Sequence, residues 1–130
     1  MNNASHPAAQ FCEAVSTGGF SDWYMPAKNE LEVCYYNLKP TTATNQTSSG
    51  INANAVPARA SNYTTGTPAQ TSATAFQSGG AEQFVINAYY WASTQFSDYF
   101  ALSQYFVNGG QFNYNKTYST AVRAIRRVAV

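Results

Sequence analysis

Few residues in this chain are of the types that catalyse reactions or bind metals, and their spacing favours neither role. His6 is the single histidine, so no cluster of His, Cys and carboxylate residues has the spacing of a metal site. Glu30 and Glu32 invite comparison with a catalytic carboxylate pair, but two residues apart on a helix they lie on different faces. A solvated helix face accounts for them better. We therefore predict no catalytic residue, no metal site and no cofactor.

The two cysteines, Cys12 and Cys34, are too few for a disulfide framework. Each falls on the apolar stripe of a predicted helix. A disulfide would form only if the two helices pack together, whereas free cysteine is commonly buried in any case. Two buried free thiols are therefore the interpretation that we favour.

The composition narrows the class of protein. A chain of 130 residues is long enough for one domain with a hydrophobic core, and we assign residues 1–130 to a single domain. Charged residues make up 10% of it, against roughly 25% in average soluble domains. The net charge of +1 offers no basis for binding nucleic acid. No apolar run approaches the roughly 20 residues of a membrane span, so we expect no membrane insertion.

Two short helices are predicted in the first third of the chain, over residues 5–15 and 26–38. Ser5 can cap the first helix, and Pro40 ends the second. Each helix carries four apolar residues at i, i+3, i+4 and i+7: Ala8, Phe11, Cys12 and Val15, then Leu31, Cys34, Tyr35 and Leu38. Residues 41–80 follow with no sustained period. A segment of that length without regular structure indicates a functional excursion or a loop pinned on the surface.

The last third of the chain, from Tyr89 to Val130, is typical of antiparallel strands. It begins with the aromatic anchor Tyr89-Tyr90-Trp91 and carries the hairpin signal Asn108-Gly109-Gly110. Residues 122–128 are rich in β-branched side chains, as in a buried or half-buried strand. Between these points Tyr, Phe, Ser, Asn and Thr dominate, a composition typical of binding surfaces. An ordinary strand-rich segment with exposed tyrosines is the alternative.

These elements predict an α+β fold: two helices beside a small twisted antiparallel sheet, with long irregular loops. We expect six residues in the buried core: Trp23, Leu31, Trp91, Phe106, Val122 and Ala124. Phe11 and Leu38 should join the helices to that core. Arg123 and Arg126 have opposite parity, so at least one of them can be buried. A buried arginine would need a carboxylate or carbonyl partners, and Asp22 is the candidate.

Four groups of residues together resemble a known family. They are Gly19, Ser21, Asp22, Trp23, Met25, Pro26, Glu30 and Leu31; then Tyr90, Trp91, Ser93 and Thr94; then Phe106 and Gly109; and finally Val122, Arg123, Ala124, Ile125 and Arg126. Their order and spacing resemble the C-type-lectin-like domains related to the formylglycine-generating enzyme. Among these, the chain looks like the domain at the C-terminus of bacterial collagen-like adhesins and phage tail proteins. The resemblance spans residues 11–128 and implies a C-type-lectin-like fold.

Domains of this type also serve as the variable proteins of diversity-generating retroelements, in which adenines of a C-terminal cassette are mutated. Template codons of the AAC type can become NNC codons, which never encode Lys, Gln, Glu, Met or Trp. Within residues 98–121, the exceptions to the NNC set are Gln104, Gln111 and Lys116. The resemblance therefore implies a variable, ligand-binding segment at about residues 90–121.

The resemblance implies a receptor-binding module. The expected contact residues are Asp98, Tyr99, Phe100, Ser103, Tyr105, Phe112, Asn113 and Tyr114. We expect most of them, from Tyr99 to Tyr114, to share one exposed surface, although Phe100 could be core by its parity with Phe106. An enzyme of the formylglycine-generating type is not expected, because that chemistry needs a reactive cysteine site, and both cysteines lie on helix stripes.

The implied partner is a protein or glycan receptor on a cell surface. The chain would then belong to a virion tail or a bacterial cell surface, and it would form a trimer on a tail fibre. Two alternatives remain open: a structural cap that trimerises a tail fibre, and a glycan-binding adhesin domain without diversification.

Overall fold

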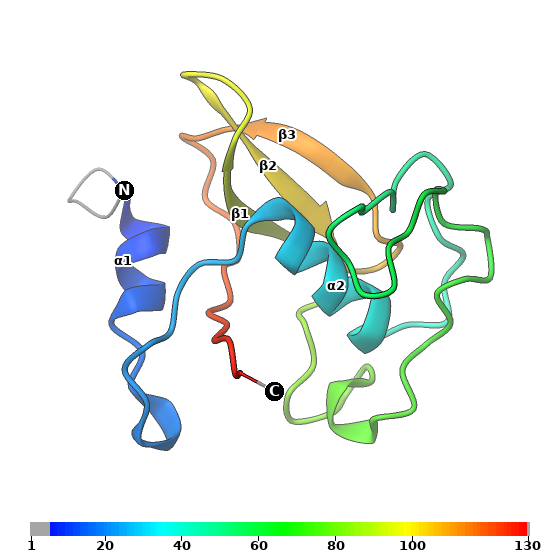
Figure 1. The fold of residues 1–130 in the computed structure, drawn as a ribbon, viewed down its shortest axis with the longest axis horizontal. Helices are drawn as coiled ribbons and strands as arrows, with labels where there is room; N and C mark the ends of the chain where they lie inside the picture. The colour runs from blue at the N-terminus through cyan, green and yellow to red at the C-terminus, as the bar shows by residue number, and fades with distance from the viewer. Residues whose placement is uncertain (1–5, 130) are drawn as a thin grey trace.

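The computed structural model describes residues 6–129, in which two helices precede a three-stranded sheet. The helices are α1 (Pro7–Glu13) and α2 (Lys28–Leu38), and the strands are β1 (Tyr89–Gln95), β2 (Phe100–Tyr105) and β3 (Gln111–Asn115). Short 3-10 turns occur at Thr17–Gly19 and Thr74–Phe76. Figure 1 shows α2 in front of the sheet and α1 to one side of it. The predicted α+β class is confirmed.

Both predicted helices form, and local chemistry explains their ends. Pro7 begins α1, because proline is tolerated in the first turn of a helix. The proposed cap of that helix, Ser5, lies outside the described residues. At the start of α2, the Ala27 backbone N–H donates to the Glu30 carboxylate at 2.9 Å, which is one half of a capping box. The helix ends at Leu38, ahead of Pro40.

The sheet is antiparallel, with the strand order β1-β2-β3. Tyr90 of β1 lies opposite Gln104 of β2, and Gln104 lies opposite Gln111 of β3. The predicted turn at residues 108–110 joins β2 to β3. Its Gly109 has a φ of 77°, a conformation that glycine adopts without a steric penalty.

The hydrophobic core lies between α2 and the sheet face that α2 covers. It is built from residues of α2, the loops and the sheet: Leu31, Tyr35, Tyr63, Phe84, Tyr90, Ala92 and Phe106. The Phe84 and Phe106 rings stack with centroids 4.0 Å apart, and Tyr35 meets Phe106 edge-on at 5.5 Å. Both arrangements are favourable for aromatic pairs, so a few large side chains fill this small core.

The prediction of the core residues is confirmed in part. Three of the six predicted residues are buried: Leu31, Trp91 and Phe106. The other three are half-buried: Trp23, Val122 and Ala124. Leu38 packs against the core as expected. Phe11 does not, since it is 59% exposed. The reason is that α1 turns Cys12, and not its aromatic neighbour, toward the interior.

Residues 41–80 form an irregular layer on the right of Figure 1, held by hydrogen bonds and not by strands. The Tyr35 hydroxyl donates to the Asn45 side-chain oxygen at 2.6 Å, and the Asn45 amide donates to the Pro68 carbonyl at 2.9 Å. The Lys39 ammonium donates to the carbonyls of Ala43 and Pro68. Buried polar side chains thus satisfy backbone groups that a sheet would otherwise pair.

The prediction of a solvated helix face at Glu30 and Glu32 is wrong. Glu32 has no exposed surface. Its carboxylate accepts hydrogen bonds from Asn52 at 2.6 Å, from the Tyr63 hydroxyl at 2.8 Å and from the Arg59 guanidinium. Glu30 is half-buried on another side of α2, so the two carboxylates do point apart. The loop layer brings the donors to Glu32, and nothing in the helical pattern reveals that layer.

The C-terminal segment contains single bridges in place of the predicted strand over residues 122–128. Ala121 pairs with Tyr90 of β1, and Ile125 pairs with Tyr24. Each bridge uses a different neighbour, so no continuous ladder forms. The candidate partner Asp22 does accept from Arg126, at 2.8 Å and 3.0 Å, but neither Arg123 nor Arg126 is buried as expected; both are half-buried.

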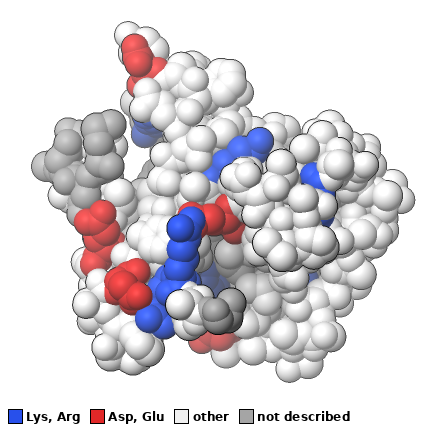
Figure 2. All heavy atoms as spheres, viewed as in Figure 1, with Lys and Arg blue, Asp and Glu red and all other residues white. Residues whose placement is uncertain are grey.

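Two further ion pairs connect the C-terminal segment to the rest of the protein. Arg123 pairs with Glu82 at 2.9 Å, and Arg127 pairs with Glu30 at 2.5 Å. Figure 2 shows charged side chains gathered over the middle and left of the viewed face, while the loop layer on the right carries little charge. Three arginines near the end of the chain thus pair with Glu82, Asp22 and Glu30.

Candidate functional site

The strand register places a group of aromatic side chains on the sheet face opposite α2. Tyr89 lies across from Tyr105, Ser103 across from Phe112, and Ala101 across from Tyr114. Because side chains alternate between the two faces of a strand, these residues face away from the core that contains Tyr90. We call the outward group the aromatic platform: Tyr89, Tyr105, Phe112, Tyr114 and Tyr118.

The rings of the aromatic platform contact one another. Tyr89 is central: its ring stacks on Tyr105 at 4.8 Å, lies 4.7 Å from Tyr114 and meets Phe112 edge-on at 5.9 Å. Tyr118 extends the group from Tyr114, also edge-on at 5.9 Å. Such cross-strand aromatic pairs stabilise an antiparallel sheet. The platform is therefore a continuous and internally supported surface.

The platform is partly exposed and uncharged. Phe112 is 38% exposed and Tyr118 is 62% exposed, while the other three rings are half-buried. A hydrogen bond with the Tyr114 hydroxyl, together with partial burial, raises the pKa of Tyr89 to about 12. That phenol is consequently neutral at physiological pH. Tyr105 donates its hydroxyl to the Asn87 side chain at 3.2 Å. The surface offers flat apolar area together with neutral hydroxyl groups.

The eight predicted contact residues do not share one surface. Tyr105, Phe112 and Tyr114 lie on the platform. Ser103 has the same parity but is 3% exposed, and its hydroxyl donates to the Phe112 carbonyl, so it lies beneath the platform. Asn113 is exposed on the opposite side of β3, where it pairs with Leu102. Alternation along β3 puts Asn113 on the opposite face from Phe112 and Tyr114, and the larger side chains around Ser103 cover its small one.

The remaining three predicted residues lie at the tip of the β1–β2 hairpin. Tyr99 is 73% exposed and Phe100 is 37% exposed, so Phe100 is not core. Asp98 is exposed, and its carbonyl accepts from the Lys116 ammonium at 2.9 Å. This contact ties the hairpin tip to the segment after β3. The ring contacts described above join the platform residues to one another, and none of them includes Tyr99 or Phe100.

Sequence reasoning missed two members of the platform, Tyr89 and Tyr118. Tyr89 belongs to the aromatic anchor, and only its register with Tyr105 reveals that it points outward. Tyr118 follows the end of β3, where the alternation of a strand no longer applies. A search for tyrosines that face the same side of paired strands would have found Tyr89, which lies on β1. It would not have found Tyr118, which lies outside the strands.

Histidine, cysteine and carboxylate side chains in residues 6–129 are the groups from which a metal site could be built. No group of three or more His, Cys, Asp or Glu side chains there is arranged to hold a metal ion. Both cysteines are free; Cys12 is buried and Cys34 is half-buried. No helix in the same range is long and apolar enough to cross a membrane.

Comparisons of the chain with protein-family models, with curated proteins and with solved structures find no match. The function is therefore argued from the residues and the geometry.

Proposed function

We propose that the chain is a receptor-binding module of the C-type-lectin-like class and that the aromatic platform is its principal contact surface. The observation that carries the proposal is a continuous cluster of five aromatic side chains, partly exposed and uncharged, in a chain with few charges. Tyrosine is well suited to such a role, because its ring meets a partner while its hydroxyl remains hydrated. Exposed apolar clusters of this kind commonly mark interaction sites.

The fold class is proposed from two kinds of support. The first is the order and spacing of the residue groups that resemble this family. The second is the arrangement of two helices, a small antiparallel sheet and a long irregular loop layer, which is compatible with a C-type-lectin-like fold. The tip residues Asp98, Tyr99 and Phe100 then form an outer rim of the binding surface.

Diversification by a retroelement is supported by where the three exceptional residues lie. Gln104 is 1% exposed, and its amide donates to the Tyr63 hydroxyl and the Gly109 carbonyl. Gln111 accepts a hydrogen bond from the Gly50 backbone. The Lys116 ammonium donates to the Asp98 carbonyl at the tip of the β1–β2 hairpin. The three residues that NNC codons cannot encode thus make structural hydrogen bonds. The platform residues within 98–121 are all phenylalanine or tyrosine, which NNC codons can encode.

The proposed partner is a protein or glycan receptor on a cell surface, with the chain carried on a virion tail or a bacterial surface. The test uses the fluorescently labelled protein against a panel of bacterial cells and a glycan array. We expect Tyr114→Ala and Tyr118→Ala to weaken binding to any partner found by about 2 kcal/mol or more. Their effect on stability should stay within about 1 kcal/mol, the scale of cross-strand pairs.

The matched control is Val56→Ala in the loop layer, where the side chain is 98% exposed. This change removes an exposed apolar group away from the platform and should leave binding unchanged. If both tyrosine variants unfold the protein, or if both bind as tightly as the parent, the platform is not a contact surface.

A further inference from the structure

We propose that the aromatic platform binds an extended, proline-rich segment of a protein partner. This inference rests on the proposed function, because it names the class of ligand that the same surface takes. Proline-rich segments adopt the polyproline II helix, and several small domains bind them on surfaces lined by aromatic side chains. The shape of the platform, its hydrogen-bonding groups and its charge all favour this class of ligand.

The rings of the platform form a ridged apolar surface across all three strands. The ring planes of Tyr114 and Tyr118 meet at 79°. Those of Tyr89 and Phe112 meet at 81°. The Tyr89 and Tyr114 rings lie 4.7 Å apart, although β2 runs between their strands, because the small side chain of Ser103 lies beneath them. Ridges of perpendicular rings are surfaces on which the pyrrolidine rings of proline can pack.

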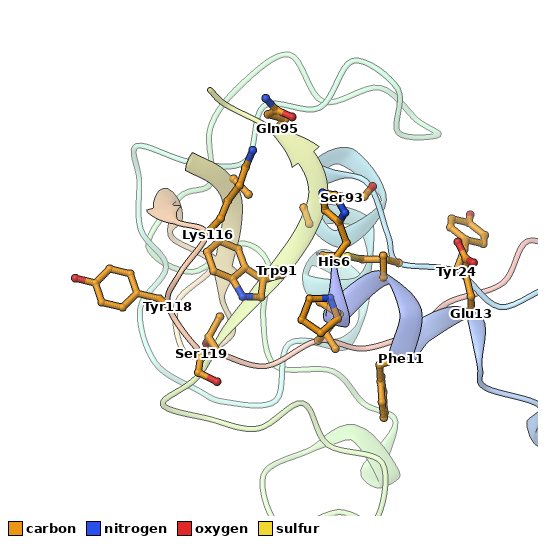
Figure 3. Close-up of a pocket in the computed structure, with 18 residues that line it drawn as sticks. His6, Phe11, Glu13, Tyr24, Trp91, Ser93, Gln95, Lys116, Tyr118 and Ser119 are labelled. Atoms are coloured by element: carbon orange, nitrogen blue, oxygen red, sulfur yellow. The ribbon is translucent and has the colours of Figure 1, made fainter. Parts of the chain in front are cut away.

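The polar groups of the platform are hydroxyls, since its five side chains include no carbonyl or carboxylate oxygen. Tyr105 donates its hydrogen to the side-chain oxygen of Asn87 and so engages that neighbouring acceptor. Tyr89 and Tyr114 share one hydrogen bond, so one of their two hydroxyl hydrogens remains available. The Tyr118 hydroxyl extends away from the other labelled side chains in Figure 3. A ligand therefore meets free donors and few acceptors.

Proline suits such a surface because it has no backbone N–H. An ordinary extended peptide would bury N–H groups against the rings, and a buried donor without an acceptor is unfavourable. A glycan meets the same difficulty, because each of its many hydroxyl groups is a donor as well as an acceptor. The carbonyl groups of a proline-rich segment are acceptors only, and they can receive the hydroxyl hydrogens of Tyr118 and of the Tyr89–Tyr114 pair.

The absence of charge from the five platform side chains matches a segment that is itself uncharged. Lys116 is the cation closest to Tyr118 along the chain, and its ammonium donates to the Asp98 carbonyl. In Figure 3 that ammonium points toward Gln95 and away from Tyr118. A polyproline II segment is also extended before it binds, so it loses little conformational entropy on the platform.

The test measures the binding of fluorescently labelled decaproline, amidated at its C-terminus, by fluorescence anisotropy. We expect saturable binding that Tyr118→Ala weakens about tenfold. Tyr118→Phe keeps the ring and removes the donor, so it should weaken binding about fivefold, the scale of one hydrogen bond. Phe96→Ala is the matched control, since Phe96 is 61% exposed and Tyr118 is 62% exposed, and Phe96 lies outside the platform. That variant should bind as the parent does.

A glycine–serine peptide of the same length, with an N–H on every residue, should not bind, and neutral maltoheptaose should not displace decaproline. The inference is overturned if decaproline does not bind, if Tyr118→Ala and Phe96→Ala have equal effects, or if maltoheptaose displaces the peptide and so indicates a glycan site. The proposed function is tested separately by the cell panel. A cell-surface partner that needs the platform, together with no binding of decaproline, would leave the proposed function intact and exclude the proline-rich class.

Discussion

At the scale of single residues, Glu32 is the group whose environment departs most from its sequence context. A carboxylate on a short helix would ordinarily face water, yet Glu32 is completely buried. Burying a charge is costly unless partners surround it. Here the partners are Asn52, Tyr63 and Arg59, all from the loop layer. The Arg59 guanidinium also lies 4.0 Å above the Tyr36 ring, which shields the pair further. The network joins α2 to a layer that has almost no regular structure.

Substituting Glu32 by glutamine should therefore destabilise the protein strongly. The change leaves the Arg59 guanidinium, whose side chain is 15% exposed, without its carboxylate. Breaking one side of a buried ion pair typically costs about 3–5 kcal/mol. Urea unfolding followed by circular dichroism measures the loss. Glu82→Gln is the control, since Glu82 is 60% exposed in its pair with Arg123 and should cost at most about 1 kcal/mol. Equal effects of the two changes would refute the special role of Glu32.

The two thiols should be unreactive in the folded protein. Burial raises the pKa of both Cys12 and Cys34 to about 11. Because the thiolate is the nucleophile, few molecules at pH about 8 carry a reactive sulfur. Ellman's reagent should react slowly with the native protein and rapidly with both thiols in denaturant. Fast stoichiometric reaction of the native protein would contradict the burial of these side chains.

At the scale of elements, the turn between β2 and β3 depends on Gly109. Its φ of 77° is unfavourable for other residues. A Cβ atom there would also lie 2.3 Å from the Tyr35 ring. Gly109→Ala should therefore destabilise the protein by more than about 1 kcal/mol. Gly66→Ala is a matched control in the loop layer, because it has open space around it and no positive φ. Equal denaturation midpoints for the two variants would argue against this account of the turn.

At the scale of the whole molecule, the ion pairs of the C-terminal segment should make stability depend on pH. The Arg126 guanidinium beside Asp22 lowers the pKa of that carboxyl group. Burial acts to raise the pKa of Glu30, but hydrogen bonds from Ala27, Tyr24 and Arg127 outweigh it and lower that pKa. At acidic pH the unfolded chain thus binds more protons than the folded protein does, so stability falls as pH decreases.

The loss should begin near the unfolded carboxyl values, about pH 4–5, and continue below them. Urea denaturation midpoints at several pH values between about 6 and about 3 measure this slope. Asp22→Asn should make the slope shallower, because one of the two groups with a lowered pKa is gone. An unchanged slope in that variant would show that the Asp22 pair does not contribute.

The sequence alone determined the features that depend on neighbours along the chain. The i, i+3, i+4, i+7 stripes predicted both helices, and Asn108-Gly109-Gly110 predicted the β2–β3 turn. Both patterns express local backbone preferences, which residues a few positions apart decide. Asp22 was also named as a candidate partner for Arg123 or Arg126, although the choice of Arg126 joins residues far apart in the chain.

Tertiary structure alone decided what each side chain meets. The register between strands brought Tyr89, Tyr105, Phe112 and Tyr114 together on one face, and packing on that face buried Ser103. Packing of the loop layer buried Glu32, and the position of α1 left Phe11 beside a cavity instead of in the core. Burial depends on contacts between segments far apart in the chain, and the local periodicity of a sequence carries no information about which distant segments will meet.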